Sequence, residues 1–246
     1  MRMEIRSVDN QNVVKWEKLR MKKYRDEYGL FIVQQKHMIE EAISRELLET
    51  LLILEGKENP FDHEAITVSE KVMKKLSGNV SLNDCLGICR IAEPELPVGT
   101  SYIILENVQD PGNVGTIIRT ACSFGYDAVI LTGNCASLYN EKTIQSTQGA
   151  LFHIPVLTMD FRDAAERLKA MGVRLFATTL SSAIYLTDVS KCDRYALVFG
   201  NEGQGMSDEA VSLCDENIKI EMSGFESLNV AVACGICAHY FKNSLK

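Results

Sequence analysis

The chain has 246 residues, of which 46% are hydrophobic, and it carries a formal net charge of −7. This size and composition suffice for one large or two smaller globular domains and exclude an intrinsically disordered chain. No apolar run approaches the roughly 18 residues that a membrane span needs, and the polar N-terminus lacks the apolar core of a signal peptide. The eight cysteines do not have the spacing of a disulfide framework, so we expect a protein of the reducing cytoplasm.

The first part of the chain predicts a small α/β unit. Helices are expected at 10–23 and 36–44, and Ser69 is expected to be the N-cap of a third helix that runs to Leu76. Strands are expected at 30–33, 50–54, 66–68 and 85–91. The segment 93–99 contains two prolines and a glycine, which is typical of a linker. We therefore expect an N-terminal domain over 1–95 and a second domain over 100–246.

A basic stretch with interleaved aromatic residues lies in and just beyond the first predicted helix. Its cations, which we consider candidate RNA contacts, are Lys15, Lys18, Arg20, Lys22, Lys23 and Arg25. Such a patch can neutralise phosphates, and Trp16 and Tyr24 could stack on unpaired bases. The alternative is a solvated amphipathic helix whose Trp16 and Leu19 face the core. On this stretch alone, the two interpretations stay equally open.

From residue 101 onward, predicted strands and helices alternate. Strands are expected at 102–105, 127–131, 154–158, 173–178, 195–199 and 217–221, and helices at 113–124, 140–146, 161–171, 207–214 and 228–242. This alternation indicates a parallel sheet with helices on both faces. Because threaded chains are very rare, these rules alone predict an open doubly wound sheet.

Glycine-rich loops follow the last two predicted strands. Gly200, Gly203 and Gly205 come directly after the first of them, so the backbone can turn sharply and approach a ligand closely. The second strand ends at Ser223-Gly224, and polar Ser227 and Asn229 stand where the last helix begins. This arrangement predicts a small-molecule site lined by backbone groups.

Three segments carry a family resemblance: ENVQDPGNVGTIIRTACSFG, FGNEGQGMS and IKIEMSGFESLNVAVA. Together, and in this order over roughly the last three-fifths of the chain, they resemble the motifs of the SpoU/TrmH group of RNA ribose 2′-O-methyltransferases in the SPOUT superfamily. The segment LRMKKYRDEYGLFIV resembles the L30e-like substrate-binding domain that often precedes the catalytic domain, although Gln34-Gln35 replaces its usual Glu-Gly pair.

The resemblance implies a catalytic domain whose C-terminal part forms a deep trefoil knot around S-adenosylmethionine. It also implies a homodimer that acts on structured RNA, with ribosomal RNA favoured over transfer RNA. The active-site residues that it implies are Asn113, Arg119, Glu202, Ser227 and Asn229. The cofactor-binding residues that it implies are Thr178, Thr179, Leu180, Gly200, Asn201, Gly203, Ile220, Met222 and Leu228.

The expected reaction needs no metal ion, because a sulfonium methyl donor is already positively charged. An arginine with a pKa above about 12 is a poor base, so we expect Arg119 to hold the neighbouring phosphate and to stabilise the developing alkoxide. The proton would pass to a phosphate oxygen or to Ser227. We expect Glu202 to orient Arg119 or to bind the ribose.

Two other features of the sequence have alternative explanations. Cys234 and Cys237 have the spacing of a redox or metal motif, but they lie in an apolar helix and are better explained as buried small side chains. The glycines at 200–205 do not form a dinucleotide-binding fingerprint, which disfavours a nucleotide-dependent oxidoreductase. A catalytically silent RNA-binding relative and a tRNA-directed 2′-O-methyltransferase stay open.

Overall fold

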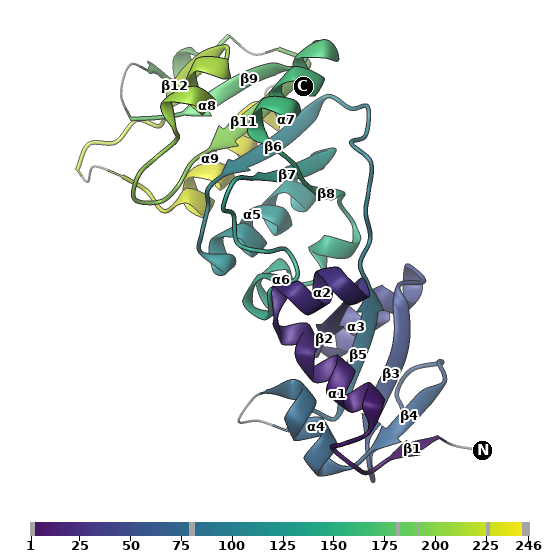
Figure 1. Ribbon diagram of the computed structural model, residues 1–246. Helices are drawn as coiled ribbons and strands as arrows, with labels where there is room; N and C mark the ends of the chain where they lie inside the picture. Colours follow the sequence, from purple (N-terminus) through teal and green to yellow (C-terminus); the bar gives the residue numbers. More distant parts are fainter. Residues whose placement is uncertain (1–2, 79–81, 181–182, 191, 225–226, 243–246) are drawn as a thin grey trace. The chain divides into compact units, whose positions relative to one another are not determined.

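The computed structural model describes residues 3–78, 82–180, 183–190, 192–224 and 227–242, and the chain falls into two compact units (Figure 1). The first unit comprises Met1–Ala92 and Tyr139–Gln145, and the second comprises Glu93–Leu138 and Ser146–Lys246. The short segment belongs with the first unit because, for example, the ring of Tyr139 packs against that of Phe31 with centroids 4.5 Å apart.

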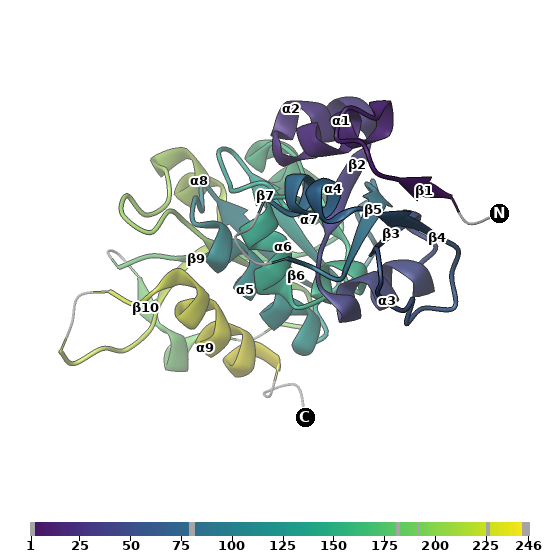
Figure 2. The ribbon, with the colours of Figure 1, turned by 90° about the horizontal axis from the view of Figure 1, so that it is seen from below.

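The first unit is a five-stranded mixed sheet between helices. Its strands are β1 (Glu4–Ile5), β2 (Leu30–Val33), β3 (Leu48–Leu54), β4 (Ala65–Val68) and β5 (Cys85–Arg90), in the order β1-β4-β3-β5-β2. Strands β1, β4 and β3 are parallel, whereas β5 is antiparallel to both of its neighbours. Figure 2 shows α1 (Gln11–Glu17) and α2 (Lys22–Tyr28) on one side of this sheet and α3 (Lys36–Ser44) on the other.

The core of the first unit is built by apolar residues from its helices and its strands. Val13, Trp16 and Leu19 are buried against apolar residues of α4 (Glu70–Ser77) and of strands β3 and β5. Helix α4 begins at the predicted N-cap, where Ser69 Oγ accepts a hydrogen bond from Val72 N. The strands and the second and third helices predicted for this part of the chain are confirmed.

The prediction of one continuous helix over 10–23 is wrong. Helix α1 passes into the short 3₁₀ helix η1 (Lys18–Arg20), Met21 is extended (φ −92°, ψ 129°), and α2 runs on to Tyr28. The break is stabilised by Arg25, which is buried and whose Nη1 donates to the carbonyls of Leu19 and Arg20. A side chain from beyond the break therefore satisfies carbonyls that a continuous helix would bond internally.

The second unit contains a seven-stranded sheet in which every pair is parallel. Its strands are β6 (Ser101–Glu106), β7 (Ala128–Thr132), β8 (Val156–Thr158), β9 (Arg174–Thr178), β10 (Ile184–Tyr185), β11 (Tyr195–Phe199) and β12 (Glu216–Lys219), in the order β10-β12-β9-β11-β6-β7-β8. The predicted parallel sheet is confirmed, with the two-residue strand β10 added at one edge.

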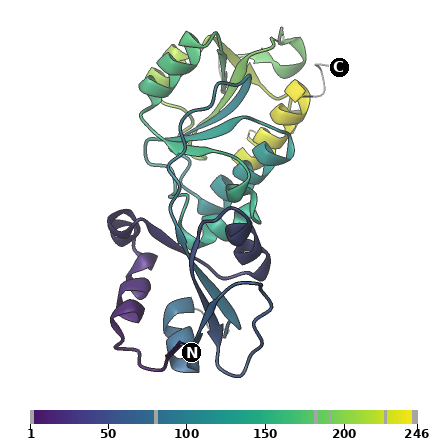
Figure 3. The ribbon, with the colours of Figure 1, turned by 90° about the vertical axis from the view of Figure 1, so that its right-hand side faces the viewer.

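Helices cover both faces of this sheet, as Figure 3 shows for the yellow helix α9 on one side and the green helices α7 and α8 on the other. Ile103 and Leu105 of β6 pack with α5 (Pro111–Ser123) and α9 (Val230–Lys242). Tyr102 and Ile104 point to the opposite face, toward α7 (Phe161–Ala170) and α8 (Asp208–Leu213). Because all strands are parallel, the loops that follow β6, β9, β11 and β12 leave the same edge of the sheet.

Three short helical segments complete the fold: α6 (Glu141–Thr147), η2 (Ala150–Phe152) and η3 (Leu186–Asp188). Within the ranges that the structure describes, we find no helix with the length and apolar character that a membrane crossing requires.

Candidate active site

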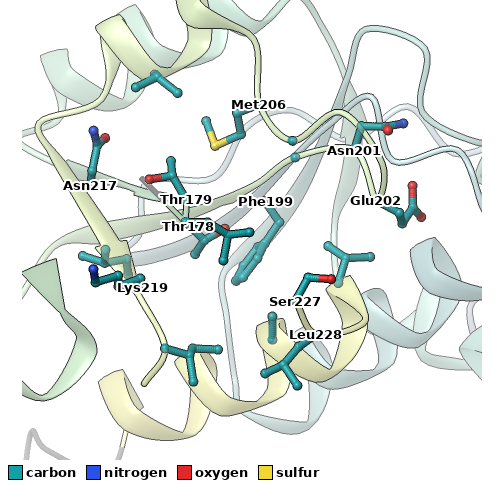
Figure 4. A pocket seen from close by; sticks show the side chains of 18 of the residues that line it. Thr178, Thr179, Phe199, Asn201, Glu202, Met206, Asn217, Lys219, Ser227 and Leu228 are labelled. Atoms are coloured by element: carbon teal, nitrogen blue, oxygen red, sulfur yellow. The ribbon is translucent and has the colours of Figure 1, made fainter. Parts of the chain in front are cut away.

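A cavity of about 600 Å³ lies at the edge of the second sheet where β9, β11 and β12 end (Figure 4). This volume falls within the roughly 300–1,000 Å³ of small-molecule sites. All nine residues that the sequence predicts for cofactor binding line it: Thr178, Thr179, Leu180, Gly200, Asn201, Gly203, Ile220, Met222 and Leu228. Three separate loops therefore converge on one pocket.

The loop after β11, residues 201–207, has a closed and specific shape; we call it the cofactor loop. The backbones of Asn201 and Gly205 pair with each other, and Asn201 Oδ1 accepts from the amides of Gly203 and Gln204, both at 2.9 Å. A Cβ atom at Gly200 would lie 2.5 Å from Met206 N, so this position leaves no space for a side chain. The glycine is thus required by a close approach of the backbone to itself.

The lining combines apolar surfaces with a few charged groups. Phe199, Ile220 and Leu228 offer apolar contacts, whereas Glu202, Asp208 and Lys219 carry the charges. Lys219 Nζ also lies 4.7 Å from the centre of the Tyr185 ring. A pocket with backbone groups, apolar walls and two carboxylates fits an adenine base joined to a sulfonium cation.

Sequence reasoning missed Asp208, Asn217 and Lys219 as lining residues. The signal was available in part, because Asn217 and Lys219 are alternate residues of β12 and so point to the same face of the sheet. Asn217 and Lys219 were not predicted because they flank the apolar Ile218 in a strand, where polar residues are usually explained as the solvent-facing side of the sheet.

Three of the predicted active-site residues form one hydrogen-bonded chain. Asn113 Nδ2 donates to Glu202 Oε1 at 2.8 Å, and Asn229 Nδ2 donates to Asn113 Oδ1 at 3.0 Å. Asn229 Oδ1 in turn accepts from the amides of Ala231 and Val232 at the start of α9. The chain therefore joins the first turn of α5, the cofactor loop and the N-terminus of α9.

The other two predicted active-site residues lie apart from this chain. Ser227 is exposed and lines the cavity. Arg119 is exposed on α5, outside the cavity lining. Its guanidinium makes no hydrogen bond or ion pair with any residue that the structure describes. Six residues separate it from Asn113, a rotation of about 240° around the helix axis, so the expected Glu202–Arg119 contact stays a prediction.

The cysteine pair of α9 faces the core. Burial raises the pKa of the Cys237 thiol to about 12 and that of Cys234 well above its ordinary value, which keeps both thiols protonated. Among the described residues, no group of three or more His, Cys, Asp or Glu side chains is arranged to hold a metal ion. The geometry thus favours the packing role for these cysteines.

The basic stretch of the first unit divides into an exposed face and a buried one. Lys15 lies over the ring of Tyr28 at 5.1 Å, and Lys18 and Lys23 lie over Tyr24 at 5.2 and 5.5 Å. The side chains that turn inward are Trp16, Leu19 and Arg25. Trp16 is therefore part of the core and not a stacking platform, while the lysines stay exposed or half-exposed beside two tyrosines.

Two of the six predicted RNA contacts are engaged in the protein itself. Arg20 Nη2 donates to the carbonyl of Lys75 at 2.8 Å, and Arg25 donates to the carbonyls at the break between η1 and α2. Arg25 is only 5% exposed, so its position supports a structural role.

Two family descriptions match the chain. Residues 100–239 match the SpoU rRNA Methylase family, and residues 10–86 match the MRM3-like substrate binding domain. The first match covers the whole cavity and the hydrogen-bonded chain of Asn113, Glu202 and Asn229. The second covers the exposed lysines and tyrosines.

Individual relatives agree with these matches over nearly the full length. The 23S rRNA (guanosine(2553)-2′-O)-methyltransferase RlmP of Bacillus subtilis is 33% identical, with 97% of this chain and 99% of the relative covered. The AdoMet-bound rRNA methyltransferase from Sinorhizobium meliloti superposes with a TM-score of 0.89 at 27% identity, covering 99% and 98% of the two chains. The fold is also shared with AviRb from Streptomyces viridochromogenes, with a TM-score of 0.87 at 24% identity and coverage of 96% and 98%.

Proposed function

The chain belongs to the SpoU rRNA methylase family, and we propose that it methylates a ribose of ribosomal RNA. It is an S-adenosylmethionine-dependent RNA 2′-O-methyltransferase. The observation that carries the proposal of ribosomal RNA is the similarity to the Bacillus subtilis 23S rRNA enzyme over 97% of this chain, because it includes both domains.

We propose that the cavity at the ends of β9, β11 and β12 holds the cofactor. The backbone groups of Gly200, Ile220 and Leu228 would surround the adenosine, and the carboxylates of Glu202 and Asp208 favour a cation in the same space. The cofactor supplies a methyl group that is already activated by the positive charge on sulfur.

We propose that Arg119 acts on the RNA and not on the cofactor. It is exposed, lies outside the cavity lining and has no intramolecular partner in the described part of the chain, so its guanidinium can grip a phosphate with two hydrogen bonds. In that position it would hold the acceptor nucleotide and stabilise the alkoxide that develops on the 2′-oxygen. A phosphate oxygen would take the proton, either directly or through the hydroxyl of Ser227, which would accept it and pass on its own.

The chain Asn113–Glu202–Asn229 would fix the cofactor loop against α5 and α9 during the reaction. Their proposed task is to hold the donor and the acceptor in line. Positioning of this kind can account for several kcal/mol of a methyl-transfer barrier, up to roughly 7–11 in favourable cases.

We propose the division of labour that the sequence predicts, with substrate binding in 1–95 and catalysis in 100–246. The face of Lys15, Lys18, Lys22 and Lys23 beside Tyr24 and Tyr28 suits a structured RNA with unpaired bases. We also propose a cytoplasmic homodimer in which Arg119 of one subunit serves the site of the other. The deep trefoil knot stays an expectation of the family resemblance.

Transfer of a radiolabelled methyl group from S-adenosylmethionine to purified RNA fractions tests this proposal. We expect label in ribosomal RNA at a ribose 2′-oxygen, and its loss by at least about 100-fold in Arg119→Ala. Arg167→Ala, at an exposed position of α7, is the matched control and keeps wild-type activity. Label in transfer RNA in place of ribosomal RNA would show that transfer RNA is the substrate. Binding of the cofactor without methyl transfer to any RNA would indicate a catalytically silent RNA-binding relative.

A further inference from the structure

A buried carboxylate stands at the end of β6, behind the cofactor loop. Glu106 is only 5% exposed, and both of its oxygens are used. Its Oε1 accepts from Asn107 Nδ2 at 2.9 Å, and its Oε2 accepts from the backbone amide of Ser207 at 3.2 Å. Since a buried carboxylate is costly unless it is hydrogen-bonded, these two donors and Glu106 stabilise one another.

Asn107 makes a second set of contacts to the same region. Its carbonyl accepts from Asn201 Nδ2 at 2.9 Å, and its Oδ1 accepts from the amide of Asn134 at 2.9 Å. The residue has a left-handed backbone (φ 59°), a conformation in which asparagine is enriched. A Cβ atom at Gly133 would lie within 2.4 Å of Asn107 Oδ1, so the neighbouring loop also leaves space for this side chain.

Glu106 and Asn107 thus bind the cofactor loop at both of its ends. Asn107 holds its first residue, Asn201, and Glu106 holds its last residue, Ser207. Between these anchors lie Gly203, which lines the cavity, and Glu202, which lines it and bonds to Asn113. β6 neighbours β11 in the sheet, so the anchors come from the strand directly beside the one that the loop leaves.

We propose that Glu106 and Asn107 are positioning residues for methyl transfer, which hold the cofactor loop in the shape that binds S-adenosylmethionine and that presents Glu202 to Asn113. This inference rests on the proposed cofactor site. Neither residue lines the cavity, so both act through the loop and not by touching the cofactor.

This role uses both acceptor oxygens of Glu106. A glutamine has the same length but only one acceptor oxygen, whereas two donors, Asn107 Nδ2 and Ser207 N, converge on the carboxylate. Glu106→Gln therefore leaves one donor facing an amide nitrogen, with almost no change in volume. Either the bond to Ser207 or the bond that fixes the Asn107 side chain is therefore lost, while the core behind the loop stays filled.

Calorimetric titration of the full-length protein with S-adenosylmethionine, together with steady-state kinetics, tests the inference. We expect Glu106→Gln to raise the Kd and the KM for S-adenosylmethionine about tenfold, the effect of losing one hydrogen bond to a charged group. Glu209→Gln is the matched control, because Glu209 is an exposed residue of α8 that pairs with Arg162. It leaves both constants within about twofold.

A purely structural role would lower the thermal midpoint of Glu106→Gln without changing the Kd of the folded protein, and that result would overturn the proposal. If Glu106→Gln does not fold, Asn107→Gly replaces it, since glycine accepts the left-handed backbone. This variant keeps the carbonyl that accepts from Asn201 but removes the donor to Glu106, and we expect the same direction of change in the Kd. A wild-type protein that does not bind S-adenosylmethionine would instead refute the cofactor site itself.

Hydrogen exchange of the wild-type protein tests independently whether Glu106 holds the cofactor loop. Without cofactor, we expect the amide of Ser207 to exchange at least about 100-fold more slowly than in an unstructured peptide. Exchange at the free-peptide rate would mean that Glu106 does not hold the loop, and the proposal would be abandoned.

Discussion

The side-chain amide of Asn113 donates to Glu202 Oε1 at 2.8 Å, although the two residues are 89 positions apart in the chain. The bond joins the first turn of α5 to the cofactor loop. Asn229 completes the connection from the N-terminus of α9. Two helices that pack side by side beneath the sheet are thereby tied to a loop that lines the cavity.

Loss of this link affects turnover more than cofactor affinity. Asn113→Ala releases Glu202 from α5 but leaves both proposed anchors of the cofactor loop, at Glu106 and Asn107, in place. We expect kcat to fall about 10- to 100-fold, because small misplacements in an in-line transfer are costly, with a Kd for S-adenosylmethionine within about threefold of wild type.

Thr116→Ala is the control for this experiment. Thr116 is exposed on the same helix, and its hydroxyl donates to the carbonyl of Gly112 within α5. We expect wild-type kcat. Wild-type kcat in Asn113→Ala as well would show that the link has no part in catalysis.

Gly200 is the position where the smallest possible change has a large effect on the cofactor site. The Cβ of alanine would lie 2.5 Å from Met206 N and 2.6 Å from the carbonyl carbon of Gly205, both backbone atoms that cannot move alone. We expect Gly200→Ala to weaken S-adenosylmethionine binding about 10- to 100-fold, or about 1.4–2.8 kcal/mol. Gly203→Ala is the comparison in the same loop, because its Cβ would meet Asn201 Oδ1 at an ordinary 3.6 Å. Equal effects of the two substitutions would contradict the steric argument.

Asp127 predicts a dependence of stability on pH. Burial by itself raises the pKa of this carboxyl, but hydrogen bonds from the amides of Thr100 and Ser101 and from the Ser101 hydroxyl hold it below its ordinary value. A depressed pKa contributes stability above the unfolded value of about 3.9. That contribution is lost as the pH falls through the lower pKa of the folded state.

Asp127→Asn should therefore be less stable than wild type at pH 7 and converge with it in acid. Because the carboxyl is only half-buried, we expect a modest difference of about 1 kcal/mol at pH 7, or about 2–4 °C in the thermal midpoint. Asp163→Asn, at an exposed position of α7, serves as the control. Calorimetric scans of the wild type and Asp127→Asn at several pH values check this expectation. A difference in stability between the two proteins that persists undiminished below about pH 3 would show that it does not come from the charge of Asp127.

Substitution of the exposed lysines of the first unit should affect RNA binding, whereas substitution of its buried arginine should affect stability. Replacing Lys15, Lys18 and Lys23 together by glutamine should lower RNA affinity and reduce the slope of log K against log salt by about 2–3, if each contacts a phosphate. Cofactor affinity should not change. The triple variant Lys36→Gln, Lys57→Gln, Lys71→Gln makes the same charge change elsewhere on this unit and controls for net charge.

Arg25→Gln tests the contrast. Its guanidinium caps the carbonyls of Leu19 and Arg20 from a buried position, so we expect a loss of stability of about 1–3 kcal/mol and an unchanged salt slope for RNA binding. A reduced salt slope of RNA binding without a loss of stability would instead show that Arg25 contacts RNA.

The elements that the sequence predicted well are those whose cause is local. The strand Tyr195–Phe199 is an apolar run bounded by glycine, and helix α4 begins at a serine N-cap, so each could be identified without knowledge of its neighbours. Strand β10 could not be identified in this way, because two residues have no periodicity and its pairing with β12 is purely tertiary.

In the candidate active site, too, features with a local cause were predicted and tertiary contacts were not. The motifs identified many of the residues that line the cavity, but not their hydrogen-bond partners. Nothing near Glu202 in the sequence indicates that it bonds to Asn113, and nothing near Met21 indicates that Arg25 stabilises a break there. Glu106 was passed over because it continues an apolar strand, and its role depends on Ser207, which is 101 positions away.

The outward face of α9 predicts the oligomeric state. Val232 is 51% exposed and Ile236 is 39% exposed, and four residues apart on a helix they lie on the same face. Arg119, on the neighbouring helix α5, is exposed, does not line the cavity and makes no hydrogen bond or ion pair with the other four proposed active-site residues in the described part of the chain. A dimer that covers the face of α9 would hide these apolar side chains and could bring the arginine of one subunit to the cofactor of the other.

Light scattering should therefore give twice the mass of the chain for the wild-type protein. Val232→Glu with Ile236→Glu should give a folded monomer, since each carboxylate would have to be desolvated in the interface, and methyl transfer should fall at least about tenfold. Val98→Glu makes the same change at a residue that is 82% exposed in the linker and should leave both mass and activity unchanged. An active wild-type monomer, or a doubly substituted protein that still dimerises and turns over normally, would show that α9 does not form the interface and that Arg119 reaches its substrate within one chain.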